Sequence, residues 1–517
     1  MADAIAERSS GRVGAGPDAR RSPGLRTFDT PVRAATLVFV LALVPRFGLV
    51  LLSRGGLTGN FGYDPAVYYT SADALVHGRL PYRDFVLLHP PALMITLTPF
   101  AVLGRLTSDH VGFIVGNIAF MILGAGNATL VVVVARRLRI PAHAAVLGGI
   151  FYALWLGVVT TETSSRLEPL GSFFFLLALW ALLGQERTRN RLLLGGMALG
   201  ASAAVKIWWI APLVVLVGWE ALSDPTRRRA LWVAGGSVIS LSLILGPFFV
   251  LAPSAMWRMV VTDQLGRHRS TNTVQRLNEL SSLHAAFPSL HGAPDYAALV
   301  LIGFVVATLG VRARRSREGR VVLGIAVLQL AVLLVSPTYF PYYSGYPAVA
   351  FALVVAISAG SGRNAPVRIS GPAASGAVIA CAALLTVAAL VLRSGSYVAA
   401  FPGSQLASRV SGVRCVMADA PMALIELNVL SRDLANGCPN WVDVSGRTYG
   451  VDSPPGGRYA RREHNAIWQS DIRRYLLSGG AFMIIRPQTG LSKATRAFLT
   501  RQPVLARSHG YVIYRVP

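Results

Sequence analysis

Long apolar stretches that alternate with short arginine-rich segments are the feature that most constrains this chain. A helix needs about 20 apolar residues to cross the ~30 Å hydrocarbon core of a bilayer. Hydrophobic residues make up 53% of the 517 residues and charged residues only 14%, which is more apolar surface than one water-soluble core would bury. We therefore expect an all-α polytopic membrane protein whose main solvent is lipid.

Eleven apolar runs qualify as membrane-spanning helices, and several of them are short for an untilted span. They lie near residues 33–53, 110–134, 142–160, 168–184, 192–205, 207–222, 230–252, 294–310, 320–336, 341–359 and 375–393. Residues 1–32 carry no long apolar stretch and no cleavage-site pattern, so we expect a disordered cytoplasmic tail rather than a signal peptide.

A further apolar run at residues 89–104 decides the topology. Counted as a span, it would place the next arginine cluster outside the cell and reverse every later loop. Read as a helix on the outer face, it leaves these arginines inside, as the positive-inside rule requires: Arg136, Arg137, Arg139, Arg187, Arg189, Arg191, Arg227, Arg228, Arg229, Arg312, Arg320, Arg363 and Arg368. Because these arginines fall in short bursts between apolar runs rather than along one face, we expect a lipid bilayer and no nucleic acid as partner, despite the net charge of +25.

This topology predicts a multi-pass plasma-membrane protein with a cytoplasmic N-terminus. Residues 33–393 then form the membrane domain, with long outer loops at 54–109 and 253–293. Residues 394–517 alternate short strand patterns with amphipathic helix patterns, which predicts a small extracytoplasmic α/β domain. Two cysteines, Cys415 and Cys438, lie in this domain, and outside the cell we expect them to form a disulfide.

The first outer loop holds the densest group of residues suited to chemistry. Asp64 follows the first span and is succeeded by Tyr68, by the pair Arg83 and Asp84, and by His89. A carboxylate at a membrane mouth can deprotonate a hydroxyl or hold a divalent cation. The same Asp-Pro step also suits a helix start with no chemical role, so the local pattern leaves both interpretations open.

The first outer loop resembles that of the GT-C superfamily of membrane glycosyltransferases. The resemblance lies in four features: an acid directly after the first span, a tyrosine-rich helix, a G-x-x-P-Y-R-D-F stretch, and an H-P-P entry to an outer-face helix. The resemblance covers about residues 10–400 and extends to actinobacterial mannosyl- and arabinofuranosyltransferases and to the protein mannosyltransferase and aminoarabinose transferase type. It implies a polyprenyl-phosphate-linked sugar donor and gives Asp64 the role of catalytic base or metal ligand. Relatives commonly have Glu after this acid, whereas Pro65 stands here.

Later segments add residues that agree with the resemblance. Arg166 and Glu168 lie at the outer end of a span, where an ionisable pair is costly unless it faces a polar cavity or pairs internally. Lys206 suits a lipid phosphate, and snorkelling to the interface is the alternative. Gln264 and Arg267 suit a phosphate or sugar, although a solvated loop also explains them.

An aromatic outer turn contains Tyr342 and Tyr343, where relatives often carry a histidine, and membrane-interface anchoring is the alternative interpretation. The chain has no phosphate-binding loop, dinucleotide fingerprint or metal-type Cys/His cluster, which disfavours a nucleotide-sugar enzyme.

We therefore expect an inverting hexosyl- or pentosyltransferase that uses Asp64 as general base. It would transfer a sugar from the lipid-linked donor to a cell-envelope glycan or lipoglycan, with a divalent cation at Asp64 as the one cofactor to consider. A transporter or lipid flippase and a non-catalytic glycan-binding scaffold are the alternatives. The flippase would carry ionisable residues at the membrane midplane and a repeated half, neither of which is visible.

Overall fold

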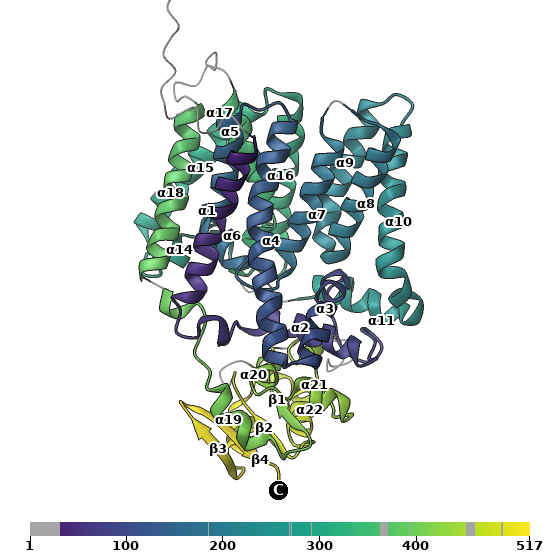
Figure 1. Cartoon of the computed structure of the whole chain (residues 1–517), viewed down its shortest axis with the longest axis vertical. Coiled ribbons are helices and arrows are strands. Elements are labelled where there is room, and N and C mark those ends of the chain that lie inside the picture. Colours follow the sequence, from purple (N-terminus) through teal and green to yellow (C-terminus); the bar gives the residue numbers. More distant parts are fainter. Residues whose placement is uncertain are drawn as a thin grey trace, which may run out of the picture.

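The computed structural model describes residues 31–517 except 185, 268, 270, 291, 362–370, 393, 451–460 and 487–489. Nearly all of the tail predicted at 1–32 lies outside these residues, as do Arg363 and Arg368. The described chain forms a helical bundle with a small sheet-containing domain at one end, which Figure 1 shows at the bottom. We call this end of the bundle the domain end.

The predicted spans correspond to helices of the bundle, which has the predicted all-α character. These are α1 (Pro31–Leu51), α4 (Asp109–Arg137), α5 (Ala142–Leu154) continued by α6 (Leu156–Thr161), α7 (Leu167–Leu182), α8 (Arg189–Val205), α9 (Ile210–Ser223), α10 (Arg228–Leu251), α15 (Ala293–Ala313), α16 (Arg317–Val335), α17 (Ala348–Gly360) and α18 (Gly371–Leu392). Among the described residues, six helices are long and apolar enough to cross a membrane by length and composition.

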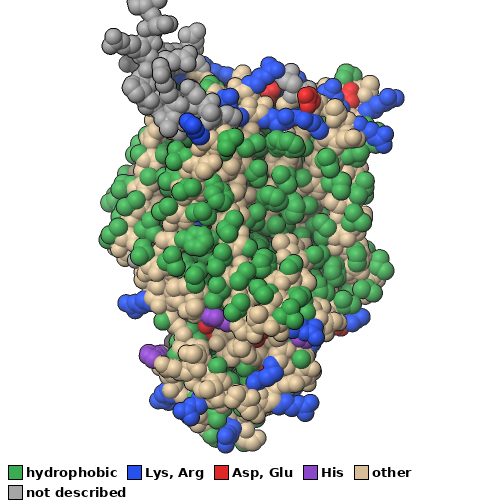
Figure 2. Space-filling model, viewed as in Figure 1, with side chains coloured by type: hydrophobic (Ala, Val, Ile, Leu, Met, Phe, Trp, Pro, Cys, Tyr) green, Lys and Arg blue, Asp and Glu red, His purple; other side chains and the backbone are tan. Residues whose placement is uncertain are grey.

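Side-chain chemistry divides the molecule along its long axis. Hydrophobic side chains cover the middle of the bundle, while Lys and Arg side chains gather at the end opposite the C-terminal domain and on that domain itself (Figure 2). An apolar band between two polar ends is the distribution expected for a membrane protein.

The run predicted as an outer-face helix forms α3 (Ala92–Leu106), whose 15 residues are too few for an untilted span. It packs against α2 (Tyr63–Val76) and α4. Figure 1 shows α2, α3 and α11 (Pro253–Trp257) together at the domain end. Shorter helices of the second long loop are α12 (Asp263–Leu265), α13 (Thr273–Ser281) and α14 (Leu283–Ala286).

The C-terminal domain is built on a four-stranded sheet of order β1-β2-β4-β3. Strand β1 (Val416–Ala418) pairs in parallel with β2 (Ala481–Met483), and β4 (Tyr511–Arg515) pairs antiparallel with both β2 and β3 (Val504–Ser508). The helices are α19 (Gly403–Val410), α20 (Pro421–Glu426), α21 (Leu430–Ala435), α22 (Ala466–Leu476) and α23 (Lys493–Thr500). Cys415 and Cys438 form a disulfide whose Cα atoms are 5.7 Å apart.

The domain is fixed to the bundle by a continuous apolar core and by hydrogen bonds. Buried side chains of α2 and α3 share one hydrophobic cluster with those of α20. Ser431 donates to Asp73 of α2 over 2.9 Å, and Asn428 accepts from the backbone of Asp109 at the start of α4 over 2.8 Å. These contacts hold the C-terminal domain directly over the first long loop.

Candidate functional site

The first turn of α2 places Asp64 at the domain end. Gly62 precedes the helix with a φ of 95°, a conformation that L side chains rarely adopt, and it allows the chain to turn into the helix. Pro65 lies in the first turn, where its missing N–H costs nothing. The Asp64 side chain remains 29% exposed, so it can be reached by a ligand.

Residues from two distant segments meet at one oxygen of the Asp64 carboxylate. Tyr342 donates its hydroxyl hydrogen bond to Oδ2. The Arg166 Nη1 atom lies 3.6 Å from the same oxygen, and the Arg166 guanidinium lies 4.2 Å from the centre of the Tyr342 ring. Among the described residues, Oδ1 of Asp64 has no hydrogen-bond partner. One carboxylate oxygen is therefore fixed and the other is free.

Lys206 and Glu168 form a buried ion pair beside this carboxylate group. Their Nζ and Oε1 atoms are 2.8 Å apart, and both side chains are at most 3% exposed. The Lys206 Nζ atom lies 3.7 Å from the ring centre of Trp208 and 3.8 Å from that of Tyr343. Lys206 therefore does not snorkel, and Glu168 pairs with Lys206 rather than with Arg166.

His89 and Arg267 lie on the same side of the site as Lys206, and of the two only Arg267 carries a charge. Burial, and after it the positive charges of Lys206 and Arg267, lower the pKa of His89 well below its usual value. The His89 ring lies 5.9 Å from that of the buried Tyr68. Arg267 stacks over Tyr449 at 4.7 Å, and its Nε atom is buried without a hydrogen-bond partner in the described structure. Arg267 therefore has a donor that remains available to a ligand.

Three predicted site residues do not join this cluster. Arg83 and Asp84 pair with each other at 2.9 Å on the exposed part of the loop. Gln264 uses its side-chain amide to hold the backbone carbonyl of Leu88, so it supports the loop that carries His89. We grouped these residues with Asp64 because they are polar or lie near it in the loop. Neither property determines the direction in which a side chain points.

Sequence reasoning missed the part of the site that comes from the C-terminal domain. Tyr63, next to Asp64, donates its hydroxyl to Asp443 over 2.8 Å and accepts from the backbone N–H of Ser445 over 2.7 Å. The Arg486 guanidinium covers the Tyr63 ring at 4.1 Å. Burial raises the pKa of Asp443, against the lowering effect of the Tyr63 hydrogen bond. No local signal in the sequence links residue 63 to residue 443.

The surroundings of Asp64 do not fit a divalent cation. Such an ion takes several oxygen ligands, usually including more than one carboxylate. Asp64 instead has a guanidinium and a phenol at its Oδ2 atom. Within the described parts of the chain, no group of three His, Cys, Asp or Glu residues is arranged to hold a metal.

Comparisons with known proteins agree on one class of membrane fold. Residues 87–337 match the model of glycosyltransferase family 87. The structure is similar to that of ArnT from Cupriavidus metallidurans bound to undecaprenyl phosphate, with a TM-score of 0.58, 15% identity, and coverage of 93% of this chain and 98% of that chain. The apo state of the same protein gives a TM-score of 0.61, 14% identity, and coverage of 94% and 99%.

The apo oligosaccharyltransferase of Archaeoglobus fulgidus is also similar, with a TM-score of 0.50, 14% identity, and coverage of 87% of this chain and 69% of that chain. No curated protein sequence matches. At these identities the structural similarity shows the fold, which is that of the GT-C membrane glycosyltransferases, as the first-loop motif predicted.

Proposed function

We propose that this chain, which has the GT-C fold and matches glycosyltransferase family 87 over residues 87–337, transfers a sugar from a polyprenyl-phosphate-linked donor to a cell-envelope glycan or lipoglycan. The transfer takes place at the outer face of the plasma membrane, which is the side we assign to the domain end. The observation that carries this proposal is the free Oδ1 atom of Asp64 beside the cationic group of Lys206 and Arg267.

Asp64 acts as general base in this proposal. Its free Oδ1 takes the proton from an acceptor hydroxyl while the hydroxyl oxygen attacks the anomeric carbon of the donor sugar. The bond from that carbon to the phosphate oxygen breaks, and its electron pair leaves with the polyprenyl phosphate. Attack opposite the leaving group inverts the anomeric configuration. Arg166 and Tyr342 hold the carboxylate in place through Oδ2.

Lys206 and Arg267 bind the donor phosphate. Charge that develops on the departing phosphate is stabilised by fixed positive groups at a water-poor site. Lys206 is held in place by Glu168, Trp208 and Tyr343, so Glu168 is a positioning residue that acts through Lys206. Neutral His89 adds an imidazole to the same wall without adding charge.

The test uses purified protein in liposomes with radiolabelled polyprenyl-phosphate mannose or arabinose and envelope glycan fragments as acceptors. We expect a glycoside product whose anomeric configuration, read by NMR, is opposite to that of the donor. Movement of the lipid-linked sugar between leaflets without transfer would favour a flippase. Binding of glycan without consumption of any donor would favour a scaffold.

A further inference from the structure

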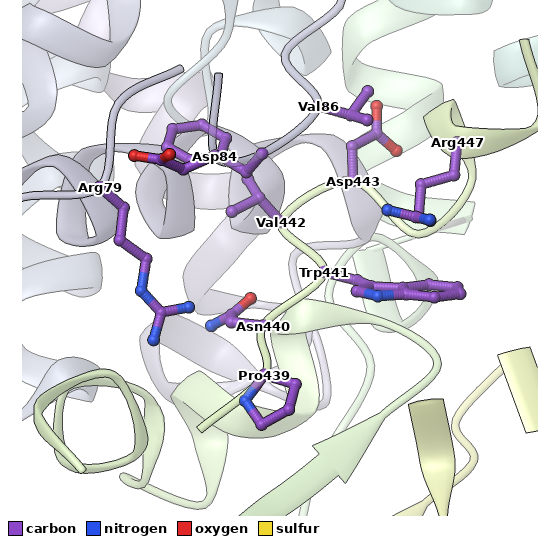
Figure 3. A pocket seen from close by; sticks show the side chains of 10 residues that line it. Arg79, Asp84, Val86, Pro439, Asn440, Trp441, Val442, Asp443 and Arg447 are labelled. Carbon is purple, nitrogen blue, oxygen red and sulfur yellow. The ribbon is translucent and has the colours of Figure 1, made fainter. Parts of the chain in front are cut away.

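A cavity of about 260 Å³ lies where the C-terminal domain meets the first long loop (Figure 3). Its apolar walls come from Phe85, Val86 and Val442. The polar and aromatic groups that line it are Arg79, Asp84, Asn440, Trp441, Asp443 and Arg447. The site described above does not use this cavity, although Asp443 belongs to both.

The domain side of the cavity is held rigidly. Residues 439–443 follow Cys438, which the disulfide ties to Cys415 at the start of β1. Arg79 donates to the carbonyl of Cys438 over 2.9 Å. The Trp441 ring stacks on Tyr475 with centres 4.5 Å apart, and the Arg447 guanidinium lies 4.0 Å from the Trp441 ring centre. A ligand would therefore meet a preformed wall, which reduces the cost of ordering on binding.

Asn440 is the residue in this wall whose side chain has unsatisfied hydrogen-bonding groups. Both polar atoms of its side chain are buried, and neither has a hydrogen-bond partner in the described structure. Figure 3 shows the Asn440 amide pointing across the cavity toward Arg79. Buried polar groups are normally paired, and an unpaired one calls for an explanation such as a ligand or an ordered water. An amide offers both donors and an acceptor, which suits neighbouring sugar hydroxyls.

The charge of the lining indicates what kind of ligand fits. Two arginines, Arg79 and Arg447, stand against two carboxyl groups, Asp84 and Asp443, so the formal charges cancel. In the phosphate-binding wall, by contrast, two cations, Lys206 and Arg267, stand with one paired carboxylate, Glu168. A neutral ligand rich in hydroxyl groups would find donors and acceptors here without paying for an unmatched charge.

The cavity is linked to Asp64 through Asp443 and Tyr63. Asp443 accepts a hydrogen bond from Tyr63, whose chain neighbour is Asp64. The volume of the cavity lies just below the ~300–1,000 Å³ of pockets that enclose a whole small ligand. It would therefore hold one unit of a longer molecule whose next part continues toward Asp64.

We propose that this cavity binds a neutral sugar unit of the acceptor glycan and thereby delivers the acceptor hydroxyl to Asp64. The proposal rests on the proposed glycosyl transfer. Asn440 is its specificity-determining residue, with Arg79 and Arg447 as further donors and Asp443 as the link to the catalytic turn.

The test compares the wild type with Asn440→Leu in the full-length protein in nanodiscs. Leucine has nearly the shape of asparagine but makes no hydrogen bond. The matched control is Asn436→Leu, since Asn436 is an exposed residue of the same domain outside the cavity. The probes are neutral mannotriose and arabinofuranotriose, measured by calorimetry, together with acceptor and donor KM values in the transfer assay.

We expect the wild type and Asn436→Leu to bind at least one neutral trisaccharide. Asn440→Leu should bind it at least ~10-fold more weakly and raise the acceptor KM by a similar factor, with an unchanged donor KM. Its thermal unfolding temperature should equal or exceed that of the wild type, because an unpaired buried amide has been removed. Asn440→Asp, which keeps the size but loses the N–H donors, should also weaken binding.

Trisaccharide binding and acceptor KM that are unaffected in both variants would overturn the cavity assignment, and so would a failure of the wild type to bind either probe. These outcomes differ from failure of the proposed function. If neutral glycan binds in an Asn440-dependent way but no sugar leaves the lipid donor, the assignment of the cavity as a sugar-binding site stands, while the glycosyl-transfer proposal and the delivery of an acceptor hydroxyl to Asp64 fall.

Discussion

The buried pair of Lys206 and Glu168 offers a test that separates a structural role from phosphate binding. Lys206→Met leaves the Glu168 carboxylate buried without its partner, since the two atoms lie 2.8 Å apart and both side chains are at most 3% exposed. Breaking such a pair by removing one member typically costs about 3–5 kcal/mol. The double variant Lys206→Met/Glu168→Gln removes both charges, so its stability should return to near that of the wild type.

Activity should not return with stability. If Lys206 holds the donor phosphate, its loss removes a charged hydrogen bond worth about 1.5–3 kcal/mol. At 1.36 kcal/mol per tenfold change, kcat/KM for the lipid donor should fall by roughly 10- to 150-fold in the double variant. The assays are thermal unfolding followed by tryptophan fluorescence, and sugar transfer in liposomes.

A second buried pair supplies the control. Arg187 and Glu220 also form an ion pair, with the Glu220 side chain 1% exposed, on elements away from Asp64. Arg187→Met/Glu220→Gln should leave the donor kcat/KM close to that of the wild type. Recovery of donor kcat/KM in the Lys206→Met/Glu168→Gln protein together with its stability would refute the phosphate-binding role and leave Lys206 as a structural residue.

Three further predictions concern stability. Burial raises the pKa of Glu426 from 4.5 to about 8, so the folded state holds a proton that the unfolded state releases, and stability should fall as the pH rises across this window. Glu426→Gln should flatten that dependence in thermal unfolding scans from pH 5 to 8. Replacing Cys415 and Cys438 by serine opens a loop of 23-residue separation and should cost about 3 kcal/mol, measured by denaturant unfolding of the C-terminal domain signal. Glu162→Gln should destabilise the bundle by roughly 3–5 kcal/mol, because it leaves buried Arg46 without its carboxylate partner. An unchanged unfolding midpoint in either of the last two variants would contradict the corresponding prediction.

The positions of the membrane helices along the chain could be predicted because their causes are local. The length of an apolar run indicates whether a helix can cross the bilayer. The composition of α3 resembles that of a span, and only the arginine bias of the neighbouring loops led us to count α3 apart from the spans. Arg166 and Lys206 were identifiable because placing an ionisable side chain beside an apolar membrane run costs free energy unless that side chain is paired or faces a polar cavity. Their partners were not, since Arg166 turns to Asp64 while Glu168 turns to Lys206.

The C-terminal domain was less predictable. The amphipathic stretch that begins at residue 422 does not form one helix. It is divided into α20 and α21 at Asn428, which adopts a φ of 54° and accepts a hydrogen bond from the backbone N–H of Asp109 at the start of α4. Strand β3 lacks a strong apolar alternation, so its sequence gives little indication of a strand. Tyr63 and Asp443 are 380 positions apart, and only docking of the domain onto the first loop brings them together.

The most direct test of the account is Asp64→Asn against Asp471→Asn in the lipid-donor transfer assay. Asp471 is a good match because its side chain is 22% exposed and it also faces an arginine, Arg474, at 3.3 Å, but it lies on the C-terminal domain away from the site. Loss of a general base should lower kcat by about 10²–10⁴-fold with little change in donor KM. Asp471→Asn should retain the wild-type kcat. Wild-type kcat in Asp64→Asn, or an equal loss in both variants, would contradict the assignment of Asp64 as the catalytic base.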